Sequence, residues 1–126
     1  MRIILSRKGF DSASGGYPSP IMPDRRMVSL PIPEENSGIK YSKLQFTHDK
    51  NYYSLMQELM GNEIRSENSK LFLEEDLCCH LDPDIYKEIT DRDAGWRGAF
   101  GQVSGAQTHL EKQGVKEGDL FLFFGW

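Results

Sequence analysis

Three short polar segments carry the side chains that could do chemistry in this chain. The first segment follows an apolar run and contains Arg7, Lys8, Asp11 and Ser12. Two cations and a hydroxyl beside a flexible glycine suit the binding of a phosphate or another anion. The segment lacks a Walker or dinucleotide-binding fingerprint, so a solvated charged loop is the alternative interpretation.

The second segment places His80 two residues before Asp82. If both side chains point the same way, an imidazole and a carboxylate suit proton transfer, so His80 and Asp82 are the candidate catalytic residues. Asp82 also precedes a proline, and it could instead be the N-cap of a helix that begins at Pro83. No additional ligands stand at the spacing of a metal site, and the residues indicate no particular cofactor.

The third segment is rich in glycine and contains Trp96, Arg97 and Gln102. An aromatic ring, a guanidinium and an amide are the groups that stack on a nucleic-acid base and hydrogen-bond to its edge. The alternative interpretation is a loop that leads into a helix and whose aromatic side chains belong to the core. The first interpretation makes Trp96, Arg97 and Gln102 candidate ligand-binding residues.

A helix predicted over residues 100–113 extends this candidate site. Its periodicity places Gln107 in an apolar stripe with Phe100, Val103 and Leu110. A buried amide needs hydrogen-bonding partners, which a ligand or a neighbouring backbone could provide, so Gln107 is a further candidate ligand-binding residue. His109 falls on the opposite side of the helix and is expected at the surface.

The elements that must position these side chains are short and mixed in order. We expect strands at 2–6, 27–30, 43–47, 77–80 and 120–124, helices at 49–61, from 82 onward and at 100–113, and a polar linker at 62–70. Residues 3–5 within the first strand and residues 120–124 are unbroken apolar runs, which are typical of buried strands. The mixed order favours an α+β fold with a small mixed sheet, which could be barrel-like, and two to three helices.

Length and composition restrict the class of protein. A chain of 126 residues is expected to form one domain, and its net charge of −4 disfavours tight, non-specific binding to duplex DNA. No apolar run has the length of a membrane span, and Cys78 and Cys79 are adjacent and unsuited to an ordinary disulfide, so a soluble cytoplasmic protein is expected. Because the chain ends on an apolar strand, we expect either a longer parent protein or a homo-oligomer that covers this strand.

Several uncommon strings, taken in order, resemble the nucleotide modification associated domain 3 family, and they cover almost the whole chain: 7–12, 15–16, 18–20, 29–33, 80–84, 96–102 and 118–126. The resemblance implies a link to modified bases in phages and bacteria, and it assigns no catalytic residue. It also implies either the amino-terminal part of a longer member or a compact phage-type version. The closing Gly-Asp and apolar strand are similar to base-binding PUA-like barrels, at the level of fold analogy only.

The residues and the resemblance together give two functional hypotheses. In the first, the domain binds a nucleotide or modified base: Arg7 and Lys8 hold phosphate, and Gln102 or Gln107 reads the base. Whether it also catalyses a reaction is left open. In the second, the protein is a non-enzymatic phage sponge or inhibitor that sequesters a nucleotide signal or a host defence protein. A purely structural module that pairs its last strand with another chain is a third hypothesis.

Overall fold

The computed structural model describes residues 1–66, 69–80, 94–95, 102 and 104–125. These residues form short helices and strands in mixed order, which confirms the α+β class: β1 (Ile3–Ser6), the 3-10 helix η1 (Tyr41–Lys43), β2 (Gln45–Thr47), β3 (Lys50–Asn51), α1 (Tyr52–Met60), β4 (Glu63–Ser66), β5 (Ser69–Phe72), α2 (Ser104–Lys112) and β6 (Leu120–Phe123). The strands pair as β1–β6, β2–β3 and β4–β5, and the described residues contain no closed barrel. Neither described helix has the length and hydropathy needed to cross a bilayer.

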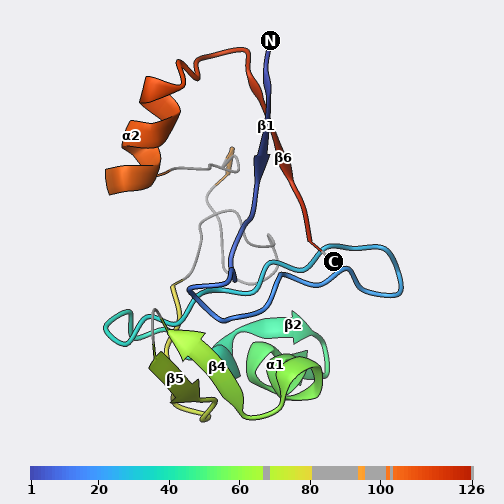
Figure 1. The fold of residues 1–126 in the computed structure, drawn as a ribbon. Coiled ribbons are helices and arrows are strands. Elements are labelled where there is room, and N and C mark those ends of the chain that lie inside the picture. Colours follow the sequence, from blue (N-terminus) through green and yellow to red (C-terminus); the bar gives the residue numbers. More distant parts are fainter. Residues whose placement is uncertain (67–68, 81–93, 96–101, 103, 126) are drawn as a thin grey trace.

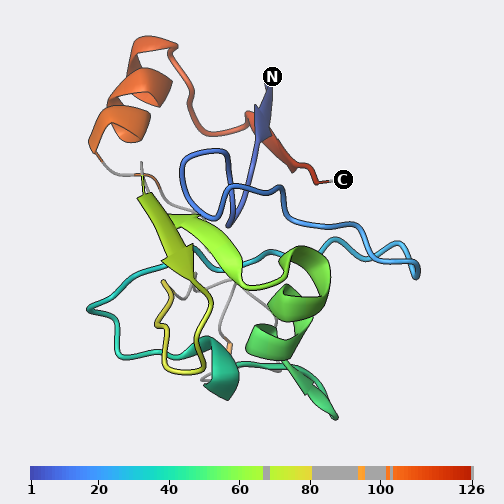
Figure 2. The same ribbon diagram turned by 60° about the horizontal axis from the view of Figure 1, so that its bottom comes forward.

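The molecule has a packed body and a projecting ribbon. Helix α1 and strands β2, β4 and β5 gather at one end, and the β1–β6 ribbon extends away from them with α2 alongside (Figure 1). A view turned about the horizontal axis keeps α2 and the ribbon apart from α1 (Figure 2). The buried core belongs to the body and consists of Phe10, Val28, Leu30, Tyr41, Leu44, Tyr52, Leu55, Met56, Ile64, Leu73 and Cys79.

Helix α1 forms close to where the sequence predicted it. The Asn51 side chain accepts a hydrogen bond from the Ser54 backbone N–H at 2.9 Å, and Gly61 ends the helix with a φ of 74°. Tyr52, Leu55 and Met56 are buried, as the stripe predicts. Leu59 was expected in the same stripe, but it is 43% exposed, and the next residue, Met60, packs against the core instead.

Residues 62–70 were predicted to be a polar linker, but they contain most of the β4–β5 hairpin. Ile64 pairs with Leu71 on the inner face, and Arg65 pairs with Lys70 on the outer face. Ile64 is 1% exposed, so this hairpin closes one side of the core. The prediction was wrong because a strand with a single inward apolar residue resembles a polar loop, and only the partner strand reveals the alternation.

The strands predicted at 27–30 and 77–80 do not form. Val28 and Leu30 are buried, but this segment makes isolated contacts: the Phe10 N–H donates to the Leu30 carbonyl at 2.9 Å, and Met27 bridges Ile21. Pro31 and Pro33 lack the N–H groups that a ladder requires. Residues 77–80 form only isolated β-bridges, from Cys78 to Lys40 and from Cys79 to Pro33.

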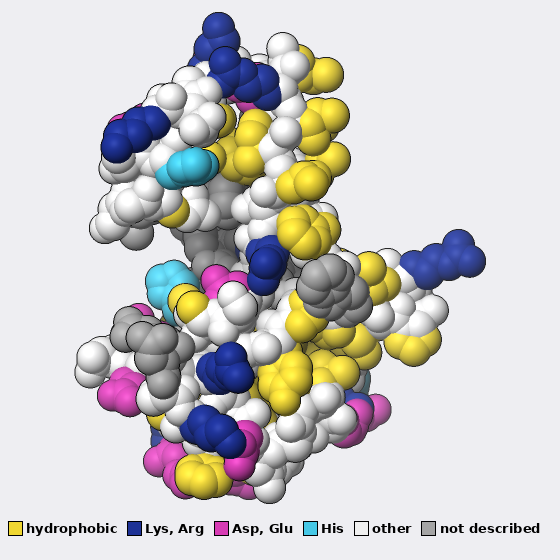
Figure 3. Space-filling view, viewed as in Figure 1, with side chains coloured by type: hydrophobic (Ala, Val, Ile, Leu, Met, Phe, Trp, Pro, Cys, Tyr) yellow, Lys and Arg dark blue, Asp and Glu magenta, His cyan; other side chains and the backbone are white. Residues whose placement is uncertain are grey.

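The prediction that residues 2–6 and 120–124 are buried strands is wrong in its burial. They form a parallel pair in which Ile3 faces Leu120 and Leu5 faces Leu122. These four side chains are 59%, 46%, 70% and 42% exposed, respectively. No third described strand joins the pair. The apolar side chains are visible along the ribbon in Figure 3, so one face of the ribbon is exposed and the other faces α2.

The adjacent cysteines differ in burial, which leads to a first prediction. Both are free thiols; Cys79 is 0% exposed and Cys78 is half-buried. Burial, and then the neighbouring Cys78, raise the pKa of Cys79 to about 12. Because the thiolate is the nucleophile, iodoacetamide at about pH 8 should alkylate Cys78 in the native protein and Cys79 only after unfolding in urea. Mass spectrometry reads both sites, and rapid native labelling of Cys79 in a Cys78→Ser variant would contradict the assigned burial.

Candidate functional site

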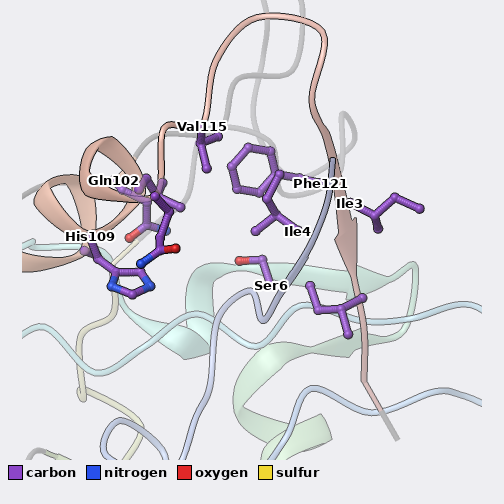
Figure 4. A pocket seen from close by; sticks show the side chains of 11 residues that line it. Ile3, Ile4, Ser6, Gln102, His109, Val115 and Phe121 are labelled. Atoms are coloured by element: carbon purple, nitrogen blue, oxygen red, sulfur yellow. The ribbon is translucent and has the colours of Figure 1, made fainter. Parts of the chain in front are cut away.

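A cavity of about 460 Å³ separates α2 from the β1–β6 ribbon. Ile4, Val115 and Phe121 point into it, whereas Ile3 points away on the other side of the ribbon (Figure 4). The strands and the turn before β6 supply an apolar wall, and Gln102 and His109 add polar groups from the side of α2 (Figure 4). The full lining is Ile3, Ile4, Leu5, Ser6, Gln102, Ala106, His109, Leu110, Gln113, Val115 and Phe121.

The face of α2 that meets the cavity is not the predicted one. The predicted helix was to begin at Phe100 and to bury Gln107, but α2 begins at Ser104, and Gln107 is exposed and donates to Glu111 Oε1 at 2.8 Å. His109, which was expected on the outer side, lines the cavity. Leu110 of the predicted stripe does line the cavity, but its α2 neighbours there are Ala106 and His109 and not Gln107, because a face that contains a histidine gives only a weak apolar signal.

Gln102 and His109 are polar side chains that the cavity could present to a ligand. The half-buried Gln102 amide and the exposed His109 imidazole form no hydrogen bond with the described residues, and both come from the helix side (Figure 4). An amide away from bulk water is costly when it has no partner, and it offers both a donor and an acceptor. Opposite them, the Phe121 ring provides an apolar surface. An amide, an imidazole and an aromatic ring around one cavity suit a flat heteroaromatic ligand.

Arg2 connects the elements at one end of the cavity through hydrogen bonds. Its backbone N–H donates to Asp119 Oδ1 at 2.8 Å, and its guanidinium donates to the Gln113 carbonyl at the end of α2. Gly114, with a φ of 65°, ends α2 in a Schellman motif, in which the Val115 N–H reaches the Leu110 carbonyl at 3.0 Å. Arg2 therefore ties β1, the end of α2 and the start of β6 to one another, and this contact sets the position of the helix relative to the ribbon.

Asp119 makes this junction sensitive to pH. Hydrogen bonds from the Arg2 and Lys116 backbone N–H groups lower its pKa below the ordinary value. A lowered folded-state pKa means that the carboxylate contributes stability above the unfolded-state value, roughly pH 3.9, and that this contribution is lost as pH falls through the folded-state pKa. The melting temperature of the wild type should therefore exceed that of Asp119→Asn near neutral pH, and the two should converge in acid. A difference independent of pH would contradict this role.

A second hollow lies where the two parallel strands end. It measures about 500 Å³ and is lined by Leu5, Ser6, Arg7, Asp11, Ser12 and Phe124. The Phe124 N–H donates to the Ser6 carbonyl at 3.2 Å, so the strand ends are joined here. Ligands of parallel sheets commonly bind beyond the carboxyl ends of the strands. The hollow shares Leu5 and Ser6 with the α2 cavity, so the two spaces adjoin along β1.

The loop after β1 has a defined shape that presents Arg7. Asp11 Oδ1 accepts hydrogen bonds from the Ala13 and Ser14 N–H groups at 2.8 and 2.7 Å. Phe10 anchors the loop in the core with 0% exposure. The exposed Arg7 guanidinium has no hydrogen bond or ion pair with the described residues. Asp11 therefore shapes the loop, and Arg7 is the cation that it offers to a ligand.

Comparison with known proteins gives one match, to a family. The model of nucleotide modification associated domain 3 matches residues 2–126. The chain belongs to this family. The resemblance seen in the sequence is thereby confirmed, and the name of the family associates the chain with nucleotide modification. The comparisons with curated proteins and with solved structures gave no match.

In this nucleotide modification associated domain, the candidate residues Lys8 and His80 line neither the α2 cavity nor the hollow at the strand ends. The Lys8 ammonium lies 5.8 Å from the centre of the Phe123 ring, in a cation–π contact, and Lys8 does not line the hollow. His80 is exposed, and its backbone N–H donates to the Ile32 carbonyl at 2.8 Å. Asp82, Trp96 and Arg97 lie outside the described residues. Among the residues that the structure describes, no three His, Cys, Asp or Glu side chains gather as a metal site.

The sequence did not single out His109 or Phe121 as site residues. Gln102, Ala106, His109, Leu110 and Gln113 recur at helical spacing, so their common face is visible in the sequence. Nothing local marks that face as the wall of a cavity, because the opposite wall comes from the two ends of the chain. Phe121 belonged to a run that was expected in the core, and only the pairing of β6 with β1 directs it toward α2.

Proposed function

We propose that the chain binds a nucleotide or a modified base, with the base in the α2 cavity and the phosphate in the hollow at the strand ends. One observation carries the proposal: two adjoining spaces share Leu5 and Ser6, and each presents a polar group without a partner among the described residues. Gln102 serves the first space and Arg7 the second. The family association with nucleotide modification supports the same class of ligand.

The base is recognised from the helix side and stacked from the ribbon side. The Gln102 amide both donates and accepts hydrogen bonds, so it can pair with the edge of a base. Phe121, Ile4 and Val115 supply the apolar contacts. Of the two glutamines in the earlier hypothesis, we assign this role to Gln102, because Gln107 is exposed and bonded to Glu111. In the hypothesis drawn from the sequence, Trp96 and Arg97 bracket the base.

Proton transfer at the base would extend the function from binding to catalysis. His109 is the titratable side chain in the lining of the α2 cavity, so it can donate or accept a proton at the bound base. The pair His80 and Asp82 is the alternative source of this chemistry. In the sponge version of the proposal, phage or host nucleotides are bound and released unchanged.

The binding proposal is tested by a matched pair of glutamine substitutions. Isothermal titration with canonical and hydroxymethylated nucleosides and nucleotides should show binding that Gln102→Ala weakens about ten-fold, the usual effect of one lost hydrogen bond in a site sheltered from water. Gln107→Ala, in the same helix, should bind like the wild type. Equal losses in the two variants, or no binding by any compound, would overturn the proposal.

A second measurement distinguishes catalysis from the sequestration of an unchanged ligand. Each ligand that binds is incubated with the protein and then examined by mass spectrometry. A changed mass that disappears in His109→Ala would assign catalysis to the cavity, and one that disappears only in His80→Ala would assign it to the earlier pair. An unchanged ligand released in full after denaturation would favour sequestration.

A further inference from the structure

The hollow at the strand ends has few charged groups in its lining. Its lining contains one cation, Arg7, and one carboxylate, Asp11, together with the hydroxyls of Ser6 and Ser12. The nearest other cation in sequence, Lys8, is placed against the Phe123 ring and does not line the hollow. Within the described residues, the hollow therefore offers one guanidinium to an anionic ligand.

One guanidinium matches one phosphate group. A phosphate monoester carries about −1.5 to −2 charges at pH 7, and the planar fork of an arginine can bind two of its oxygens at once. A triphosphate carries roughly twice that charge, and its additional groups would approach the Asp11 carboxylate without a second cation in the lining. The Asp11 carboxylate cannot easily move away, because its Oδ1 holds the Ala13 and Ser14 N–H groups at 2.8 and 2.7 Å.

The position of the hollow is also consistent with a ligand that has one phosphate group. It adjoins the α2 cavity through Leu5 and Ser6, consecutive residues of β1. A base in the cavity and a phosphate at Arg7 would then belong to one ligand, with its sugar beside Leu5 and Ser6. A second or third phosphate would have to extend past the loop that contains Asp11 and Ser12.

We propose that the site selects a nucleoside monophosphate over both the free nucleoside and the triphosphate. This selectivity rests on the proposed function and adds the number of phosphate groups to it. Arg7 is the residue that determines it, Ser12 contributes a hydroxyl to the phosphate, and Asp11 disfavours longer phosphate chains.

The experiment compares the nucleoside, monophosphate and triphosphate of each base by isothermal titration at low ionic strength, where charge effects are least screened. The monophosphate should bind about ten- to a hundred-fold more tightly than the nucleoside, the range of a charged hydrogen bond. The triphosphate should bind no more tightly than the monophosphate. Inorganic phosphate should compete with the monophosphate and leave nucleoside binding unaffected.

Substitutions identify the residue responsible. Arg7→Ala should lower monophosphate affinity to that of the nucleoside, and Asp11→Asn should improve triphosphate affinity relative to monophosphate. Lys43→Ala is the matched control, because Lys43 is an exposed cation at the end of η1 that lines neither space, and it should behave like the wild type. Circular dichroism confirms that each variant is folded.

The possible failures are distinguishable. Nucleoside binding without any gain from phosphate would overturn the monophosphate selectivity and leave the base-binding function standing. Tighter binding of the triphosphate would also overturn the selectivity, since it would require cations that the described hollow lacks. No binding by any of the compounds would overturn the proposed function together with this inference.

Discussion

Replacing Gly15 by alanine is expected to destabilise the fold by about 4 kcal/mol or more, at the upper end of what single substitutions cause. A Cβ at this position would lie 2.1 Å from Cδ2 of the fully buried Phe10 ring. The backbone cannot withdraw, because Gly15 and Arg65 exchange hydrogen bonds of 2.6 and 3.1 Å. Urea denaturation followed by circular dichroism measures the loss in the free energy of unfolding.

Gly38→Ala is the control that separates steric conflict from backbone strain. Gly38 has a φ of 71°, comparable with the 89° of Gly15, but an added Cβ would meet no atom within 4 Å. It should therefore cost only the strain of a left-handed residue, about 1–2 kcal/mol. Similar losses in the two variants would show that Phe10 does not pack against Gly15 as the structure has it.

The second large effect is expected at Tyr41, which is fully buried. Its hydroxyl donates to the Pro31 carbonyl, and the adjacent Leu30 carbonyl accepts from the Phe10 N–H at 2.9 Å. Tyr41→Ala should therefore cost about 3–5 kcal/mol, as deletion of a buried aromatic ring does. The loss should extend to ligand binding, since the segment that Tyr41 holds supports the loop carrying Arg7.

Tyr41→Phe isolates the hydroxyl from the ring. It leaves the packing in place and removes the donor to Pro31, so it should cost about 1–3 kcal/mol, the cost of an unsatisfied buried acceptor. Both variants are compared with the wild type in urea at neutral pH, where burial, which raises the pKa of Tyr41, keeps the phenol protonated. Because small domains have a free energy of unfolding of roughly 5–15 kcal/mol, the alanine variant should retain only a small part of its stability. An unchanged midpoint for Tyr41→Phe would show that the bond contributes nothing.

Local signals predicted those parts of the fold whose cause is local. Asn51 and Gly61 bracket α1 because capping depends on a side chain and a backbone conformation at the helix ends. The apolar runs correctly predicted strands at both ends of the chain, as β1 and β6. The loop from Arg7 to Ser12 was predicted to follow a strand, and it does. The family resemblance was likewise visible in short strings of the sequence and is confirmed.

Partner-dependent features could not be predicted in this way. The alternation of buried and exposed residues in the β4–β5 hairpin becomes visible only when Ile64 is paired with Leu71. The segment at 27–30 does not form a strand, because Pro31 and Pro33 after it lack the N–H groups that a hydrogen-bonded ladder requires. The position of α2 depends on contacts between distant parts of the chain, those of Arg2 with Asp119 and with the Gln113 carbonyl. A glutamine- and histidine-bearing face lines a cavity there, and helix periodicity alone cannot distinguish it from a solvated face.

The sequence by itself therefore determined the helix α1, the two terminal strands, the α+β class, the loop bearing Arg7 and the family of this chain. Only the tertiary structure decided that the first strand pairs with the last, through contacts such as Arg2 with Asp119, which stand 117 positions apart. That pairing turns Phe121 toward α2, with Gln102 and His109 on the other side of the cavity, and it gives the cavity and the hollow at Arg7 two lining residues in common. The physical reason is that caps and apolar runs are set by near neighbours, whereas a binding site requires the closure of long loops and the packing of surfaces that are distant in sequence.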